Sequence, residues 1–167
     1  MCAMLLCGGL SGMMVISSAS DMAQVEAGFS PAAAALMVSV LSLFNAGGRA
    51  SAGILSDKLG RIGTLSLVFP ISVAALCALF FFGQDSMAVF AVSIALVGAC
   101  FGALMGIFPG FTADEFGQRN NTVNYGILFF GFALSGMLGP QVASWVMSGT
   151  GSYRSAFLIA AVVALAG

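Results

Sequence analysis

The sequence predicts an all-α integral membrane protein that crosses the bilayer several times. Three observations predict this fold class. Hydrophobic residues make up 60% of the 167-residue chain and charged residues only 7%, whereas a soluble domain carries roughly 25% charged residues. The mean hydropathy is +1.08. The few charges stand in short groups that separate long uncharged runs, and about 20 apolar residues cross the hydrocarbon core as a helix.

We expect six helices, over residues 1–20, 31–56, 62–83, 86–109, 122–148 and 153–167. The first five have the length of a complete span, and we expect the sixth to be truncated and the chain to be part of a larger protein. Ser30 and Pro31 mark the start of the second helix, because serine is a common N-cap and proline is tolerated at the first helical position.

Basic residues in the connections predict the orientation. The connections at residues 57–61 and 110–121 hold Lys58, Arg61 and Arg119, whereas the other three share Arg154 alone. The positive-inside rule therefore places loops 57–61 and 110–121 in the cytoplasm. We expect a multi-pass protein of the plasma (inner) membrane.

One charged residue interrupts an apolar run. Arg49 lies eight residues before Asp57, which corresponds to about 12 Å of helical rise. A guanidinium stays protonated and is costly at membrane depth unless it faces a protein interior, a water-filled cavity or an anion. We expect Arg49 to bind a substrate carboxylate in a bidentate pair, with Asn45 one turn earlier on the same face. A structural ion pair or a snorkelling arginine are the alternatives.

A compact charged turn follows Arg49. Its glycines are expected to bring one helix close to its neighbour and to allow a sharp reversal, while its charged side chains pair with carboxylates or helix ends. Together with Asp114 and Arg119 in the next cytoplasmic connection, such a cluster can hold helices together on one side of the membrane and release them. A role in topology and capping alone is the alternative. The turn has the pattern Gly53-x-x-x-Asp57-Lys58-x-Gly60-Arg61.

This pattern resembles the signature of the major facilitator superfamily, which joins the second and third helices of each six-helix half. The resemblance implies that residues 1–167 form the C-terminal half of a twelve-helix transporter, with an N-terminal six-helix half as partner. The final position of the signature is Ile62 instead of a basic residue. Within the superfamily, the sequence is similar to the oxalate:formate antiporter family in three segments: residues 108–117, Asn124-Tyr125-Gly126 and Leu138-Gly139-Pro140.

The resemblance also concerns the substrate site. A basic residue at the position of Arg49 is associated with carboxylate binding in these antiporters, but the lysine that oxalate transporters carry on the eleventh helix is replaced here by Phe132. One fixed cation suits a monocarboxylate better than a dicarboxylate. Aromatic cavity walls are expected at Phe101 and Phe129, which share helix faces with Met105 and Phe132. The alternative is that these side chains face lipid or neighbouring helices.

The predicted function is secondary active transport of a small organic anion, a mono- or dicarboxylate, by alternating access. Exchange of anions is favoured over proton symport because histidine is absent and every carboxylate lies near a helix end. A carrier for drugs or sugars, and a non-transporting sensor on the same scaffold, are the alternatives.

Other function classes find little support. The chain has no histidine, and its cysteines lack metal-ligand spacing, so we expect no enzyme activity, no cofactor and no metal. A net charge of −1 offers no basic face for nucleic acid. The expected partners are the small carboxylate, membrane lipid and the N-terminal half.

Overall fold

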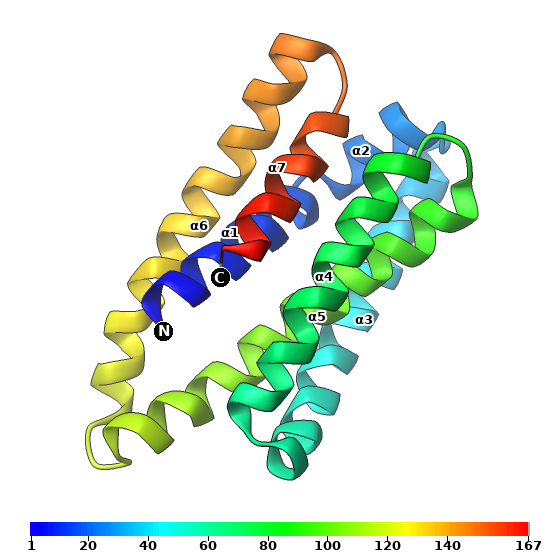
Figure 1. Ribbon diagram of the computed structural model, residues 1–167. Helices are drawn as coiled ribbons and strands as arrows, with labels where there is room; N and C mark the ends of the chain where they lie inside the picture. Colours follow the sequence, from blue (N-terminus) through cyan, green and yellow to red (C-terminus); the bar gives the residue numbers. More distant parts are fainter. Residues whose placement is uncertain (167) are drawn as a thin grey trace.

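The computed structural model describes residues 1–166, and all regular secondary structure in that range is helical. Helices α3 to α6 are each long and apolar enough to cross a membrane, and the bent pair of α1 and α2 makes a fifth candidate span. Helix α7 has 12 residues and rises about 18 Å, less than the roughly 30 Å hydrocarbon core. The helices, shown in Figure 1, are α1 (Cys2–Ile16), α2 (Ala19–Ala27), α3 (Pro31–Leu59), α4 (Arg61–Phe82), α5 (Met87–Phe116), α6 (Asn121–Thr150) and α7 (Arg154–Leu165).

The first span differs from the single helix expected over residues 1–20. It consists of α1 and α2, which meet at an angle of 58° on either side of Ser17 and Ser18. Ser17 donates its hydroxyl to the Met13 carbonyl over 2.6 Å, a local bond of the kind that competes with regular helix geometry. Helix α2 includes Asp21 and ends at Ala27. One face of α2 is buried, and Asp21 lies on its exposed face.

Helix α5 also differs from expectation, since the predicted connection at residues 110–121 is mostly helical. Pro109 lies inside α5, which continues to Phe116. The Thr112 hydroxyl donates to the Phe108 carbonyl over 2.8 Å, one turn back along the same helix. The connection to α6 is therefore short, and Asp114 lies on a helix instead of in a loop.

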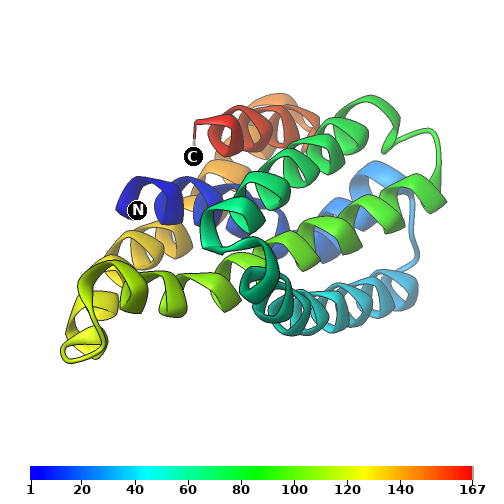
Figure 2. The same cartoon turned by 60° about the horizontal axis from the view of Figure 1, so that its bottom comes forward.

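Helix α5 is the centre of the bundle, and it is the most buried of the candidate spans. Helix α5 has its most extensive contact with α3, and it also packs on α4, α1 and α6. Figure 2 shows α5 running between α3 and α4. Helices α1 and α6 form a second closely packed pair, which α7 joins to α4. The side chains on α5 therefore reach almost every other helix.

The turns lie at the two ends of the bundle. We call the end with the α3–α4 and α5–α6 connections the Arg61 end, and the end with the α2–α3, α4–α5 and α6–α7 connections the Glu26 end. Ser30 caps α3 by accepting a hydrogen bond from the Ala33 amide over 3.3 Å. Gly60 alone separates α3 from α4, and its φ of +77° is a conformation that other residues rarely adopt.

Candidate functional site

Arg49 lies midway along α3 and is exposed. The ten other charged residues stand near the two ends of the bundle, so within residues 1–166 Arg49 is the one charged residue that lies far from both ends. Both ion pairs within residues 1–166 belong to Arg61. Arg49 is therefore not neutralised by an acidic side chain of the described chain, and its charge is available to an anion.

A stripe of glycines on α5 determines how closely α3 approaches. The backbones of Leu41, Asn45 and Arg49 lie directly against three successive glycines, so that added Cβ atoms would collide with them. At Gly106 such an atom would be 2.7 Å from the Arg49 carbonyl oxygen, nearer than real Cβ atoms come. The four-residue glycine spacing therefore brings two backbones into contact, as small residues do at helix crossings in membranes. The three glycines are Gly98, Gly102 and Gly106.

Asn45 is half-buried one turn before Arg49. Its backbone carbonyl lies against Gly102 in the same way that the Arg49 carbonyl lies against Gly106. Asn45 and Arg49 are thus held on one face of α3 by the same helix crossing.

The aromatic residues expected near the site form a continuous row. The ring centroids of Phe129 and Phe132 on α6 are 4.7 Å apart, and those of Phe132 and Phe101 on α5 are 5.9 Å apart. Phe101 is only 6% exposed and lies against Gly12 of α1, so it packs between helices and presents little surface. Phe132 is half-buried and Phe129 is 38% exposed.

Two other residues, Met105 and Tyr125, lie near this row of rings. Met105 is half-buried and packs on the same core cluster as Phe132. Tyr125, which was not among the expected site residues, extends the row, with its ring centroid 5.5 Å from that of Phe129. Tyr125 belongs to the Asn124-Tyr125-Gly126 segment that the sequence comparison with the antiporter family singled out.

At the Arg61 end, one guanidinium links three helices. Arg61 begins α4 and donates from Nε to Asp114 on α5 over 3.1 Å. Its Nη1 lies 3.4 Å from Asp57 on α3 and also contacts the Ser56 hydroxyl. Gly110 of α5 lies against the same guanidinium, where an added Cβ would be 3.0 Å from Cζ. Of the residues expected to form a gate, Asp57, Gly60, Arg61 and Asp114 are brought together.

The remaining residues of the expected gate are not part of this network. Lys58 and Arg119 are exposed, and neither forms an ion pair within the described range. Within residues 1–166, Gly53 does not bring α3 close to another helix, because a Cβ added there would meet no atom within 4 Å. The close approach between helices that was expected at Gly53 occurs instead at the three α5 glycines.

A second polar network at the Glu26 end was not anticipated. Glu26 on α2 is only 7% exposed and accepts a hydrogen bond from the Ser152 hydroxyl over 2.8 Å. It also accepts from the Gln84 amide and from the backbone N–H of Tyr153 at the start of α7. Burial, followed by the charges of Asp21 and Glu26, raises the pKa of the Tyr153 hydroxyl. One carboxylate thus joins α2, the α4–α5 connection and α7.

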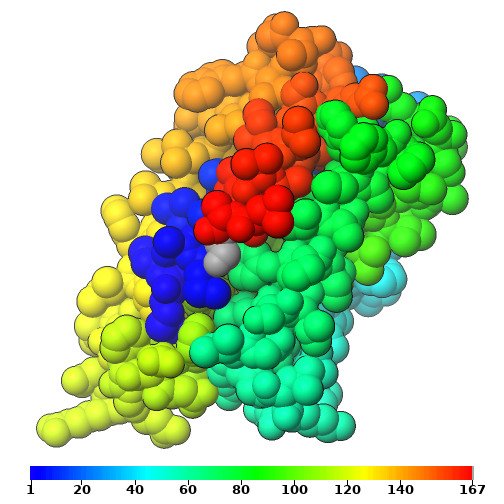
Figure 3. All heavy atoms as spheres, in the orientation of Figure 1, coloured from blue at the N-terminus to red at the C-terminus, as the bar shows by residue number. Residues whose placement is uncertain are grey.

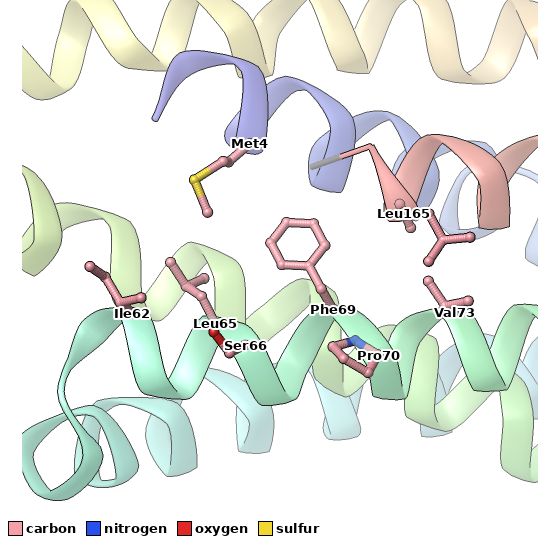
Figure 4. Close-up of a pocket in the computed structure, with 9 residues that line it drawn as sticks. Met4, Ile62, Leu65, Ser66, Phe69, Pro70, Val73 and Leu165 are labelled. Atoms are coloured by element: carbon pink, nitrogen blue, oxygen red, sulfur yellow. The ribbon is translucent and has the colours of Figure 1, made fainter.

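A cavity of about 350 Å³ lies elsewhere, between α1, α4 and α7. Figure 3 shows the face where α1 and α7 lie beside α4, and Figure 4 shows the Phe69 ring directed into the space below Met4. Ser66 is its one polar lining residue among apolar neighbours, and none of its lining residues is charged. This cavity offers nothing to bind an anion, and Arg49 does not line it.

Within the part of the chain that the structure describes, there is no group of three or more His, Cys, Asp or Glu side chains that could hold a metal ion. Of the residues expected to bind substrate, Arg49 and Asn45 supply a cation and an amide on one face of α3. A guanidinium beside an amide can bind a carboxylate.

Several long apolar helices with charged turns at their ends define a multi-pass integral membrane protein, in which Arg49 is a charge within one of the helices. The chain belongs to the major facilitator superfamily, whose family model matches residues 1–167. This confirms the superfamily expected from the charged turn, and the helices form part of that fold. The match points to a transporter and not to an enzyme.

Curated relatives support this assignment. The chain is 37% identical over 131 residues to the uncharacterized MFS-type transporter YhjX of Escherichia coli, covering 78% of this chain and 32% of the relative. It is 30% identical over 125 residues to the oxalate:formate antiporter of Oxalobacter formigenes, covering 75% and 30%. Monocarboxylate transporter 12 of Xenopus laevis is 26% identical over 137 residues, covering 81% and 30%. The chain thus spans about a third of the length of these relatives.

Proposed function

We propose that this chain forms the C-terminal six-helix half of a secondary carrier that transports a small carboxylate by alternating access. The observation that carries this proposal is the exposed charge of Arg49, which lies midway along α3 without an acidic partner in the described chain. A permanent cation at this depth is stabilised by an anion, and a guanidinium binds a carboxylate through two parallel hydrogen bonds.

The substrate class follows from what surrounds Arg49. Phe132 occupies the position where a second cation would favour a dicarboxylate, and its ring lies between those of Phe101 and Phe129. A second carboxylate placed there would lose water without gaining a partner. A monocarboxylate such as formate, lactate or pyruvate fits this half better. Two of the relatives have names that refer to carboxylates, namely an oxalate:formate antiporter and a monocarboxylate transporter.

Exchange is the transport mode that the charges favour. When the binding site closes without substrate, Arg49 has no acidic side chain within residues 1–166 to neutralise it, and a charge buried without a partner is costly. Bound carboxylate removes this penalty, so reorientation is easier for the loaded carrier than for the empty one. An anion would therefore be carried in each direction.

The Arg61 network supports a mechanical role for this half. Because Arg61 joins α4 to Asp57 on α3 and to Asp114 on α5, these three helices are tied at one end and can move as a unit. Lys58 and Arg119 lie exposed at the same end, where they can meet the N-terminal half or anionic lipid headgroups. We place this end in the cytoplasm of a plasma (inner) membrane protein, since basic residues favour that side.

The test uses the complete gene product in liposomes, with uptake of labelled formate, lactate and oxalate as the measurement. Arg49→Lys keeps the charge but loses the paired donors, and Arg49→Gln loses both. We expect the KM for the transported carboxylate to rise at least tenfold in Arg49→Lys and uptake to be lost in Arg49→Gln. Arg154→Gln, at the Glu26 end, is the matched control. Unchanged KM values in both Arg49 variants would contradict the proposal.

A further inference from the structure

Helix α2 is the short arm of a bent span, and its last turn carries a buried carboxylate. It meets α1 at 58° on either side of Ser17 and Ser18. Glu26 lies one residue before the end of α2 and is only 7% exposed. Figure 1 shows α2 at the same end of the bundle as the α4–α5 and α6–α7 connections. The carboxylate therefore lies where three separate segments of the chain come together.

Both connections donate hydrogen bonds to this carboxylate. The Ser152 hydroxyl, over 2.8 Å, and the Tyr153 backbone N–H donate to Oε1 of Glu26, and the Gln84 amide donates to Oε2. Within residues 1–166, the other side-chain hydrogen bonds of α2 lie inside that helix. Helix α2 packs mainly on α3. In the described chain, Glu26 is thus the polar link from α2 to the α4–α5 connection and to α7.

The place of Glu26 on α2 does not favour a carboxylate by itself. Glu26 continues the buried stripe of Ala19, Met22 and Ala23, where an apolar side chain would need no partner. It also lies near the C-terminal end of α2, whose partial negative charge disfavours an anion. The start of α7, in contrast, presents unpaired N–H groups and a partial positive charge. The favourable interactions of Glu26 are therefore those with other segments.

A buried carboxylate specifies a geometry that an apolar side chain would leave open. An apolar side chain can slide over its neighbours at little cost, whereas a buried carboxylate needs its donors in place. The donors to Glu26 come from two connections, so a tilt of α2 away from either one would leave polar groups unpaired. The direction of α2 after the bend is consequently fixed at its far end.

We propose that Glu26 locks α2 to α7 and to the α4–α5 connection, so that the bend between α1 and α2 keeps its angle while the carrier changes conformation. We call Glu26 and its donors Gln84, Ser152 and Tyr153 the Glu26 lock. The Glu26 end then moves as one body, and α2 does not open as a separate flap. This inference requires a carrier of this superfamily, but it does not require that the substrate is a carboxylate.

The lock is tested by the distance between spin labels on α2 and α7, in the complete gene product in liposomes. Val25 and Leu158 are 49% and 45% exposed, so labels attached at Val25→Cys and Leu158→Cys do not displace core side chains. The native cysteines are replaced first. A carrier without substrate samples both of its orientations, and we expect one narrow distance distribution throughout. Two well-separated populations would show that α2 moves against α7 and would overturn the proposal.

Two substitutions of the carboxylate separate the lock from hydrophobic packing. Glu26→Leu continues the buried stripe but accepts no hydrogen bond, so we expect the α2–α7 distance distribution to broaden severalfold. Glu26→Gln keeps an acceptor oxygen for Ser152 and Tyr153, and the Gln84 amide can turn to accept from the new NH2 group. Its distribution should stay close to that of the wild type. A Glu26→Leu distribution as narrow as the wild type would overturn the proposal.

A second pair of labels is the matched control. Leu43 on α3 and Leu96 on α5 are exposed, and their helices are held together by the glycine stripe and not by the lock. Their distance should be unchanged in Glu26→Leu, and equal broadening of both pairs would overturn the proposal. If Glu26→Leu does not fold, Gln84→Ala combined with Ser152→Ala removes two of the three donors and should broaden the α2–α7 distribution alone.

Transport kinetics give an independent measurement. Glu26→Leu should lower the maximal exchange rate severalfold, because a loose α2 no longer moves with the rest of the half, and should leave the KM unchanged. Arg154→Gln is the control, since Arg154 donates to the Phe80 carbonyl over 3.0 Å and joins α7 to α4 without α2. It should keep the wild-type rate. An unchanged rate or a raised KM in Glu26→Leu would overturn the role of the lock in transport.

The distance measurement separates this inference from the proposed function, because it needs no substrate. Unchanged KM values in the Arg49 variants, together with a broadened α2–α7 distribution in Glu26→Leu, would refute the carboxylate site and support the lock. Lost uptake in Arg49→Gln, together with an unchanged distribution in Glu26→Leu, would refute the lock alone.

Discussion

Gly106 of α5 packs directly against the backbone of Arg49 in α3, where a Cβ added to the glycine would lie 2.7 Å from the Arg49 carbonyl oxygen. The residue that carries the charge is thus positioned by its main chain, and its side chain remains exposed. The same backbone contact therefore sets both the spacing of α3 and α5 and the position of Arg49.

Substituting this glycine should disturb the site without touching a charge. In Gly106→Ala we expect a loss of about 1 kcal/mol or more in stability, since overpacking costs about 1–3 kcal/mol and exceeds the helix propensity that alanine gains. Carboxylate uptake should fall with it. Gly47→Ala on α3 is the control, because a Cβ there meets no atom within 4 Å, and its stability should stay level or rise. Thermal unfolding in detergent measures both, and equal stability of the two variants would contradict the packing argument.

The Arg61 network should contribute more to movement than to stability. Its side chains are partly exposed, with Arg61 at 26% and Asp114 at 58%, and such ion pairs are worth about 0.2–1 kcal/mol. A double-mutant cycle with Arg61→Gln and Asp114→Asn should give a coupling energy within that range, while exchange slows in each variant. Arg119→Gln removes an arginine without a described ion pair and should show no coupling to Asp114→Asn. A coupling as large with Arg119 as with Arg61 would argue against the network.

A lysine in place of Phe132 should change which anions are accepted. Phe132→Lys adds a second cation beside the proposed carboxylate site, so we expect oxalate uptake to appear or to increase and the affinity for lactate to fall. Phe132→Leu removes the ring without adding charge, and it should not gain oxalate uptake. Competition of oxalate against labelled formate measures the change. Identical behaviour of the two variants would contradict a substrate position near this residue.

Glu26 should stabilise the opposite end of the bundle. Glu26→Ala leaves the Gln84 amide, the Ser152 hydroxyl and the Tyr153 N–H without their acceptor, and a buried unpaired group costs about 1–3 kcal/mol. We expect thermal unfolding at a lower temperature, with a smaller effect in Glu26→Gln, which keeps one acceptor oxygen. Asp21→Asn, on the exposed face of α2, should have little effect. A Glu26→Ala variant as stable as wild type would show that the network carries no stability.

Local patterns in the sequence predicted the helical membrane fold and the superfamily, because apolar runs and a charged turn are local features. The ends of the helices were less predictable. Charges at Asp21 and Asp114 suggested that the first and fourth helices had already ended, but the structure continues both helices through them. Burial of one face of α2, and pairing of Asp114 with Arg61, keep these charges on helices. Arg61 is 53 residues away from Asp114 in the sequence, and the residues that bury α2 belong to other helices.

By itself, the sequence determined that the chain is built from apolar helices, that Arg49 lies far from either end of its helix, and that the turn at Gly60 is charged. These features follow from the composition and the residue spacing within single helices, and they do not depend on contacts between helices. Only the tertiary structure decided that α5 lies at the centre, that its glycines make the close contact with α3 within residues 1–166, and that Phe101 of α5 lies beside Phe132 of α6. Such relationships depend on which faces of separate helices bury one another, and that choice is made by the packing of the whole bundle.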